Sequence, residues 1–414
     1  MITIIGGTYD EWCLHPPFEE KNGSGLRACY AINSLDKNTQ IDFHTYSSEK
    51  TSKILQYLES IYKFKITKHL SKNDISFEYD HPLRKPVISP RPDLIIKPKD
   101  EIYVEAENIL YFGMLEGNAV AKGKKVVYDP QSPVKPIPFH KTKSTAGELA
   151  VVINIKEARQ IVKSDKLEVI RRYFFEKDKA SVLVIKMGPK GAMVFLKTGE
   201  SIVIPVYKTS YVWPIGSGDV FAAVFAYYWM ENGKTAFEAA QKASFSTAIY
   251  CNSRNYAFTY KKSADNIEAL NIKDYPKGKV YLAGPFFTYA QKWLINELRS
   301  SLIGLGLNVF SPWHDVGEGS VEDGVAEKDI DALKECKIVF AVVDGFDSGT
   351  IFEVGYAVKQ KIPVIAYVEN ESKPSLTMLT GTNCHIEKDM TTALYKCLWI
   401  LAENEQSNTV VGRN

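Results

Sequence analysis

The chain has 414 residues, 45% of them hydrophobic, and its 51 basic and 49 acidic residues leave a formal charge of +2. This length and apolar fraction predict two or three packed domains. The balanced charge argues against a polyanion-binding surface, so nucleic acid is not an expected partner, and no run of about 18 apolar residues predicts a membrane span.

The chain opens with a predicted strand and turn at Met1–Gly7, and Gly23-Ser-Gly25-Leu-Arg27 predicts a glycine turn that leads into a helix. Segments near Gln40–Tyr46 and Ser76–Val87 predict a small β-rich lid. The proline-rich stretch 81–92 is too broken for a regular helix and predicts a loop or a sheet edge. Six scattered cysteines, without zinc-like spacing, indicate reduced thiols in a cytoplasmic protein.

Two segments in the middle of the chain predict strands. Val151–Asn154 predicts a strand that leads into a helix through Asn154-Ile-Lys-Glu157. The segment 182–195 predicts a strand, a glycine turn and a second strand.

The most specific feature of the first 265 residues is Gly216-Ser217-Gly218-Asp219, which precedes a long apolar helix predicted to reach about Met230. Small residues before a helix leave backbone amides pointing the same way, which makes a site for an anion. A carboxylate at this position, Asp219, can accept a proton from a hydroxyl.

These segments resemble the ribokinase or PfkB family of sugar and nucleoside kinases. The resemblance implies a doubly wound, mostly parallel α/β sheet, with Asp219 as the catalytic base and ATP and magnesium as possible cofactors. Arg27 would lie on the substrate side, and Asn154 and Glu157 would organise magnesium and phosphate. The implied phosphate- and ATP-binding residues are Gly216, Ser217, Gly218, Lys186, Gly188 and Gly191.

Three positions depart from the kinase pattern. Trp213-Pro214 replaces the usual Asp-Thr, Lys186 stands where threonine is common, and Arg27 stands where an asparagine usually holds sugar hydroxyls. Arg27 indicates either an anionic substrate, since arginine pairs bidentately with phosphate, or a structural ion pair. The first half is therefore either a working kinase or a degenerate version that serves binding or assembly.

A domain boundary is expected between Lys262 and Gly278, around one short helix. We expect a first domain over 1–265, a second over 277–402, and a flexible polar tail over 403–414.

The second domain begins with a predicted strand, Lys279–Ala283, that runs into Gly284-Pro285-Phe286-Phe287. The glycine lets a ligand approach the backbone and the aromatic rings can stack on a base. Asp329 lies on a predicted helix that starts near Glu322. The strand 338–343, the loop and helix from Asp347, and the strand 363–367 form a unit that places Glu353 near the strand ends, where ligands bind in such sheets.

Residues 277–402 resemble the nucleoside 2-deoxyribosyltransferase family, which implies a Rossmann-like or flavodoxin-like parallel α/β domain. The resemblance makes Glu353 the nucleophile held by Tyr281, with Asp329 at the sugar and Asp347 exchanging a proton with the base. It implies small nucleosides, nucleotides and bases as partners, no cofactor, and a homo-oligomer. The other implied substrate-binding residues are Gly284, Pro285, Phe286, Phe287, His314, Asp315, Ser348, Gly349 and Thr350.

Alternatives remain open for the second domain. Asp347-Ser-Gly-Thr350 can be a helix cap, and Ser348 with Thr350 can hold a phosphate. We favour cleavage or transfer at an N-glycosidic bond through Glu353. The other hypotheses are a kinase that uses Asp219, with an accessory second domain, and a kinase-like module that senses nucleotides or assembles oligomers.

Overall fold

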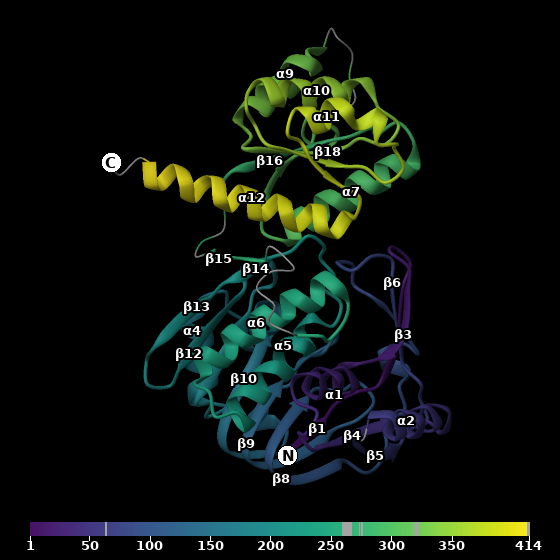
Figure 1. Cartoon of the computed structure of the whole chain (residues 1–414), viewed down its shortest axis with the longest axis vertical. Helices are drawn as coiled ribbons and strands as arrows, with labels where there is room; N and C mark the ends of the chain where they lie inside the picture. Colours follow the sequence, from purple (N-terminus) through teal and green to yellow (C-terminus); the bar gives the residue numbers. More distant parts are fainter. Residues whose placement is uncertain are drawn as a thin grey trace. The chain divides into compact units, whose positions relative to one another are not determined.

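A computed structural model of the chain (Figure 1) describes residues 1–62, 64–258, 267–272, 274, 276–317, 319 and 323–411, with side chains as far as residue 407. The chain divides into two compact units. The N-terminal unit comprises Met1–Thr209 and Trp213–Asn271, and the C-terminal unit comprises Ser210–Val212 and Ile272–Asn414.

The N-terminal unit is built on a nine-stranded sheet. All pairings from β11 to β5 are parallel, whereas β12 pairs antiparallel with both β11 and β13. In sheet order, the strands are β13 (Ser201–Ile204), β12 (Ala192–Leu196), β11 (Val182–Lys186), β10 (Thr145–Asn154), β9 (Ala119–Asp129), β8 (Ile102–Phe112), β1 (Ile2–Ile5), β4 (Ile41–Ser47) and β5 (Lys65–Leu70).

Helices cover this mostly parallel sheet, which confirms the predicted α/β class. The apolar helix α5 packs against α1 and α6, and α3 and α4 contribute Ala158, Ile170 and Phe174 to a core that they share with the strands. The helices of this unit are α1 (Ser24–Leu35), α2 (Glu49–Tyr62), α3 (Ile155–Val162), α4 (Leu167–Glu176), α5 (Ser217–Ala226) with a π-helical extension over Tyr227–Glu231, and α6 (Ala236–Ser253). Short 3-10 turns lie at Pro92–Leu94, Phe139–Lys141 and Gly188–Lys190.

A separate four-stranded sheet forms the lid, in the order β3 (Phe18–Asn22), β2 (Tyr9–Cys13), β6 (Ser76–Tyr79) and β7 (Val87–Ser89). The prediction for Ser76–Val87 is confirmed, but the assignment of Gln40–Tyr46 to the lid is wrong. Those residues form β4 of the central sheet, where the ring of Phe43 is completely buried between neighbouring strands. The segment at Tyr9–Asn22 supplies the other half of the lid.

A two-stranded antiparallel ribbon joins β14 (Val206–Lys208) to β15 (Glu268–Leu270). The sequence predicted a short helix in the region of β15, which is wrong. Backbone pairing with β14 and burial of Leu270 favour a strand there.

The C-terminal unit has a five-stranded parallel sheet, in the order β17 (Asn308–Phe310), β16 (Lys279–Ala283), β18 (Ile338–Val342), β19 (Val364–Tyr367) and β20 (His385–Glu387). Numbered within the unit this order is 2-1-3-4-5, which confirms the predicted flavodoxin-like arrangement. Its helices are α7 (Tyr289–Gly304), α8 (Pro312–Asp315), α9 (Val325–Glu335), α10 (Ser348–Lys359), α11 (Thr377–Gly381), preceded by a 3-10 turn at Pro374–Leu376, and α12 (Met390–Val411).

Two boundaries in this unit differ from the sequence prediction. The helix that carries Asp329 begins at Val325, while Glu322, where it was predicted to start, lies outside the described residues. Helix α12 continues through Val411, past Glu403, where the sequence predicted a polar tail.

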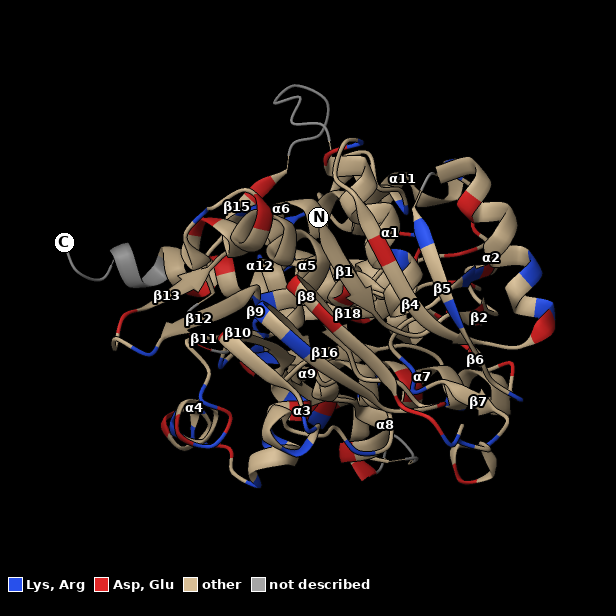
Figure 2. Ribbon diagram, turned by 90° about the horizontal axis from the view of Figure 1, so that it is seen from below, with Lys and Arg blue, Asp and Glu red and all other residues tan. Residues whose placement is uncertain are grey.

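Charged residues of both signs are interleaved on the surface elements, as Figure 2 shows along α2. This helix carries Glu49, Lys50, Lys53 and Glu59. Within the described part of the chain, no helix combines the length and hydropathy that a membrane crossing requires.

Candidate active sites

Three adjacent strands of the N-terminal sheet end in polar residues. Asp129, Asn154 and Lys186 are the last residues of β9, β10 and β11, and Asn154 lies opposite Lys186 in the strand register. Because these strands are parallel, the three side chains gather at one carboxyl edge of the sheet, where ligands bind in open α/β folds.

The Asn154-x-x-Glu157 motif forms a capping box at the start of α3. The Asn154 side chain accepts a hydrogen bond from the Glu157 amide at 2.8 Å, and the Glu157 carboxylate accepts one from the Asn154 amide at 3.3 Å. This reciprocal pairing satisfies two helix-terminal donors and fixes both side chains at the strand end. Burial raises the pKa of Glu157, and the Lys186 ammonium opposes that rise.

The small residues before α5 form a tight turn at the same edge. Gly216 has a φ of +75°, a conformation that favours glycine, and the carbonyl of Ile215 accepts a hydrogen bond at 2.9 Å from the Tyr250 hydroxyl. Asp219 is the third residue of the helix and is 8% exposed. The helix N-terminus and the carboxylate therefore face the same space.

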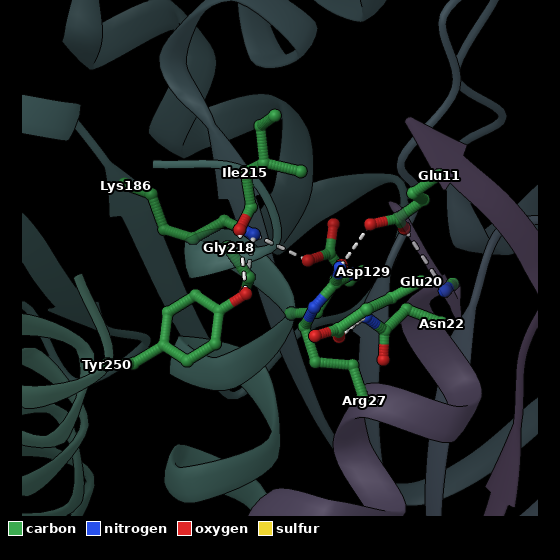
Figure 3. Close-up of polar contacts among 11 residues, drawn as sticks. Glu11, Glu20, Asn22, Arg27, Asp129, Lys186, Ile215, Gly218 and Tyr250 are labelled. Atoms are coloured by element: carbon green, nitrogen blue, oxygen red, sulfur yellow. Dashed lines mark hydrogen bonds and ion pairs between the residues drawn. The ribbon is translucent and has the colours of Figure 1, made fainter. Parts of the chain in front are cut away.

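That space is a cavity of about 350 Å³. Figure 3 shows some of the polar residues in its lining, among them Glu11, Arg27, Asp129 and Lys186. The buried hydroxyl of Ser24 and the Oδ1 atom of Asp129 lie in its lining, and neither has a hydrogen-bond partner among the described residues. Buried polar atoms are usually paired, so these two indicate space for a polar ligand. The other residues that line the cavity are Tyr9, Glu11, Gly23, Arg27, Phe77, Tyr79, Gln131, Asn154, Glu157, Lys186, Gly188, Ile215, Gly216, Ser217, Gly218 and Asp219.

Lys186 and Asp129 form a buried ion pair in this lining, with Lys186 Nζ 2.5 Å from Asp129 Oδ2. The ammonium also lies 3.4 Å from the carbonyl oxygen of Gly218. Burial raises the pKa of Asp129 to about 7, although Lys186 opposes it. Burial alone would lower the pKa of Lys186, but the carboxylates of Asp129 and Glu157 outweigh this effect and the pKa rises.

Arg27 forms the second buried ion-pair system of the cavity and is 1% exposed. Its Nη1 donates to Asp219 Oδ2 at 2.7 Å and its Nη2 donates to Glu11 Oε2. Of the two predicted readings, an anion-binding arginine or an ion pair, the structure contains the ion pair. Its carboxylate partners are themselves cavity residues.

The donor set at this edge fits a magnesium ion that arrives with phosphates. Asp129 Oδ1 is an unpartnered buried oxygen and Glu157 supplies a second carboxylate. Magnesium is commonly held by one or two carboxylates together with substrate phosphates. Among the residues that the structure describes, no group of three or more His, Cys, Asp or Glu side chains could hold a metal alone.

The cavity brings together most of the residues predicted for the kinase-like site, including Asp219, Lys186 and Arg27. Gly191 is not in its lining: its φ is +85°, and a Cβ there would come 2.2 Å from the Ile204 carbonyl oxygen, so it shapes the turn between β11 and β12. Sequence reasoning missed Asp129, although this carboxylate directly follows the apolar run 126–128.

In the C-terminal unit, Tyr281 of β16 and Glu353 of α10 meet directly. The Tyr281 hydroxyl donates to Glu353 Oε1 at 2.5 Å, and the Tyr281 ring stacks on Phe310 with centroids 5.4 Å apart. Burial raises the pKa of Glu353 to about 7, the Tyr281 hydrogen bond lowers it, and the carboxylates of Asp329 and Asp347 raise it further. Burial and the Glu353 carboxylate raise the pKa of Tyr281 well above its ordinary value.

The two aspartates beside Glu353 have different environments. Burial raises the pKa of Asp329, whose buried Oδ1 has no hydrogen-bond partner in the described structure. Asp347 is the N-cap of α10: its Oδ2 accepts hydrogen bonds from the Thr350 amide and hydroxyl, both at 2.8 Å. The capping alternative is therefore present in the structure, and it leaves the other oxygen of Asp347 for a ligand.

An aromatic group lies after β16. Phe286 stacks on Phe287 with centroids 5.6 Å apart and on Trp313 at 6.4 Å. His314 contacts Asn296 Oδ1 through Nε2 at 2.7 Å, and burial lowers the pKa of this imidazole. Trp313 and Asn296 were not predicted, because α7 and α8 meet only in the folded chain.

The remaining predicted residues have mainly local roles in this structure. A Cβ at Gly284 would come 2.6 Å from Ile295 Cδ1 and 3.1 Å from Val342 Cβ, so a larger residue there would have to displace these side chains. Asp315 accepts the Ser311 amide at 2.8 Å. Thr350 is buried against Asp347, whereas Ser348 and Gly349 are exposed, and Pro285 follows Gly284 in the loop after β16.

Comparisons with known proteins match both units. The pfkB family of carbohydrate kinases matches residues 120–261, and the nucleoside 2-deoxyribosyltransferase family matches residues 280–393. A 5-dehydro-2-deoxygluconokinase of Listeria monocytogenes is 24% identical over 202 residues, or 43% of this chain and 61% of the relative. One from Halalkalibacterium halodurans is 32% identical over 134 residues, or 31% of this chain and 39% of the relative, so both alignments span less than two thirds of the relatives' lengths.

Among solved structures, a ribokinase of Thermotoga maritima is 16% identical and covers 62% of this chain and 94% of its own, with a TM-score of 0.46. A fructokinase of Vibrio cholerae is 12% identical and covers 62% of this chain and 95% of its own, with a TM-score of 0.44. From the two family matches, the chain joins a domain similar to the pfkB carbohydrate kinases to a domain similar to the nucleoside 2-deoxyribosyltransferases.

Proposed function

We propose that the N-terminal unit transfers a phosphoryl group from ATP to a hydroxyl of a small sugar-like acceptor. The observation that carries this proposal is the gathering of Asp219, the glycine turn at 216–218, Lys186 and the Asn154-x-x-Glu157 pair around one cavity. Phosphoryl transfer depends mainly on positioning and on compensation of charge, and these residues supply both.

Each residue then has one task. Asp219 accepts the proton of the acceptor hydroxyl as that oxygen attacks the phosphorus. The N-terminus of α5 and the Lys186 ammonium stabilise the phosphoryl oxygens. Asp129 and Glu157 would hold magnesium, which would neutralise negative charge on the donor phosphates.

The acceptor class is the finer part of this proposal. The relatives named above are 5-dehydro-2-deoxygluconokinases, so sugar acids belong first in an acceptor panel, followed by neutral sugars and nucleosides. The test is ADP formation by the full chain with ATP, magnesium and each acceptor. Asp219→Asn should abolish acceptor-dependent ADP formation, whereas Asp165→Asn, which alters an exposed carboxylate paired with Arg159, should leave it unchanged. An equally active Asp219→Asn variant would refute the assignment.

We propose a second activity for the C-terminal unit: cleavage or transfer at the N-glycosidic bond of a nucleoside or nucleotide through Glu353. The supporting observation is the hydrogen bond from Tyr281 to a largely buried carboxylate with a raised pKa. Glycosyl cleavage needs one ionised carboxylate at the anomeric carbon and a separate acid for the leaving group.

The atoms balance in two steps. Glu353 Oε bonds to the anomeric carbon as the bond from that carbon to the base nitrogen breaks, and Asp347 or water protonates the base. Water or a second base then attacks the same carbon and gives its proton to Asp347 or to water, and the bond from that carbon to Glu353 breaks. The aromatic group Phe286, Phe287 and Trp313 offers ring faces for the base.

Mass spectrometry of nucleosides and nucleotides incubated with the chain, with and without an acceptor base, separates hydrolysis from transfer. Glu353→Ala should abolish base release, while Glu327→Gln, an exposed change on α9, should not. Because the family resemblance implies pockets completed across subunits, we also expect a homo-oligomer, which sedimentation analysis tests. A Glu353→Ala variant that still releases base would refute this second proposal.

A further inference from the structure

A buried arginine links three separate elements of the N-terminal unit. Arg27 lies on α1, Glu11 on lid strand β2 and Asp219 on α5. The two terminal nitrogens of the guanidinium each hold one carboxylate, and Figure 3 shows Glu11 and Arg27 directed toward one another. Since all three side chains line the cavity, this cluster is part of the proposed site.

The guanidinium also packs against the turn before α5. A Cβ built on Gly216 would come 2.1 Å from Arg27 Nε and 2.2 Å from Cζ, so the arginine lies flat against the backbone of this glycine. On the other side, Glu11 Oε1 accepts the amide of Gly23 at 3.1 Å, one residue before α1 begins. Both ends of the cluster are therefore fixed by backbone as well as by charge.

A buried guanidinium of this kind has little freedom. Arginine does not lose its proton in proteins, and its planar fork holds two carboxylates in defined directions. Here Nη1 donates to Oδ2 of Asp219 at 2.7 Å, and this hydrogen bond restricts the rotation of the carboxylate.

We propose that Arg27 is a positioning residue of the phosphoryl-transfer site, which orients Asp219 and ties it through Glu11 to lid strand β2. This inference rests on the proposed kinase function. The position of the lid and the direction of the base are then linked: displacement of β2 moves Glu11, and the arginine transmits that movement to Asp219.

This role differs from one of the two readings of the sequence, in which Arg27 binds an anionic acceptor. Both terminal nitrogens already hold carboxylates at hydrogen-bonding distance, so an acceptor anion would have to displace Glu11 or Asp219. Displacing one would leave a buried carboxylate without its partner, which is costly. A positioning role needs no such exchange.

The first test is hydrogen exchange of the full chain, followed by mass spectrometry, which does not depend on turnover. The Glu11→Gln/Arg27→Met double variant removes the tie without leaving Glu11 charged and unpaired. We expect exchange to rise together in β2 and in the first turn of α5 by about tenfold or more, as loss of a charged hydrogen bond predicts. Lys21→Met is the matched control, because it breaks the Lys21–Asp10 pair on the same lid sheet, outside the residues that line the cavity.

The control should leave the first turn of α5 as protected as in the wild type. Unchanged exchange at residues 217–221 in the double variant would overturn the tie. If the double variant fails to fold, Arg27→Lys replaces it: a lysine lacks the fork and can hold only one carboxylate well, so exchange should rise to a smaller extent in the same two segments.

The second test separates positioning from acceptor binding. With ATP, magnesium and an acceptor that the wild type uses, the double variant should lose about 100-fold in kcat, with the acceptor KM unchanged, because misplacement of a base by about 1 Å costs that much. Arg27→Lys should recover part of the kcat. A selective rise in KM for anionic acceptors, with kcat retained, would instead make Arg27 an acceptor ligand and overturn the proposal. If the wild type transfers no phosphoryl group at all, the proposed kinase function fails, while the exchange experiment still decides whether Arg27 ties the lid to α5.

Discussion

Replacing Glu353 by glutamine tests the physical state of the proposed nucleophile without any knowledge of the substrate. The pKa of this carboxyl rises from its ordinary value of 4.5 to about 7 in the folded protein, chiefly because of burial. The unfolded chain therefore releases the Glu353 proton near pH 4.5, whereas the folded chain keeps it until about pH 7. Between these values the unfolded state binds fewer protons, so this group makes the folded state less stable as the pH rises.

The size of the effect follows from the shift. Each pKa unit is worth about 1.4 kcal/mol, so the ionised Glu353 costs at most about 3 kcal/mol of unfolding free energy above pH 7. Glutamine does not titrate and keeps an oxygen for the Tyr281 hydroxyl. Relative to the wild type, Glu353→Gln should therefore become more stable by about 3 kcal/mol as the pH rises from about 5 to about 8.

The assay is urea unfolding of the full chain across this pH range, with the C-terminal unit followed by hydrogen exchange of peptides from β16 and α10. Glu327→Gln, on the exposed side of α9, is the control and should show no such trend. If the stability difference between Glu353→Gln and the wild type does not change with pH, Glu353 is not a desolvated carboxyl, and the reasoning that makes it a nucleophile fails.

Three further outcomes follow from the two sites. Tyr281→Phe removes the hydrogen-bond donor that lowers the pKa of Glu353, so this pKa should rise. In a pH profile of the rate of base release, the acid limb should therefore shift to higher pH by about one unit or more. Asp219→Asn should lower acceptor-dependent ADP formation by about 10²–10⁴-fold; because it also removes one carboxylate partner of the buried Arg27, the melting temperature should fall, and the rates are compared at a temperature where the variant is folded. Lys186→Met should destabilise the N-terminal unit by about 3–5 kcal/mol in urea unfolding, and adding Asp129→Asn should restore most of that loss, because the second change removes the unpaired buried charge.

Local patterns predicted the elements that carry the sites. The apolar run 182–185 followed by Lys186 formed a buried strand with a polar end, and Asn154-x-x-Glu157 formed a helix entry with a capping box. The strand, loop and helix around Glu353 formed for the same reason: consecutive apolar residues mark strands buried on both faces, and a carboxylate with a threonine three residues later caps the next helix.

Contacts between distant segments were not predictable in this way. Gln40–Tyr46 has the alternating polarity of a lid strand, yet β1 and β5 enclose it and bury Phe43. The pairing of Arg27 with Asp219 joins residues 192 positions apart, and that of Lys186 with Asp129 joins residues 57 positions apart. Spacing along one chain carries no information on which acid meets which base, because tertiary packing decides it.

These pairings bear on whether the kinase-like half is a degenerate remnant. Arg27 and Lys186 both depart from the pattern of the kinase family, and a buried cation without a partner would cost about 3–5 kcal/mol. Yet each has acidic partners in the same cavity, and acidic side chains outnumber basic ones in the cavity lining. The charged residues in its lining are Glu11, Asp129, Glu157, Asp219, Arg27 and Lys186. A surplus of carboxylates over protein cations suits a site that receives metal ions together with a polyanionic donor, since the metal compensates both. A pocket that served only assembly would gain nothing from this surplus of carboxylates. The charge balance therefore favours a working phosphoryl-transfer site over a degenerate kinase domain.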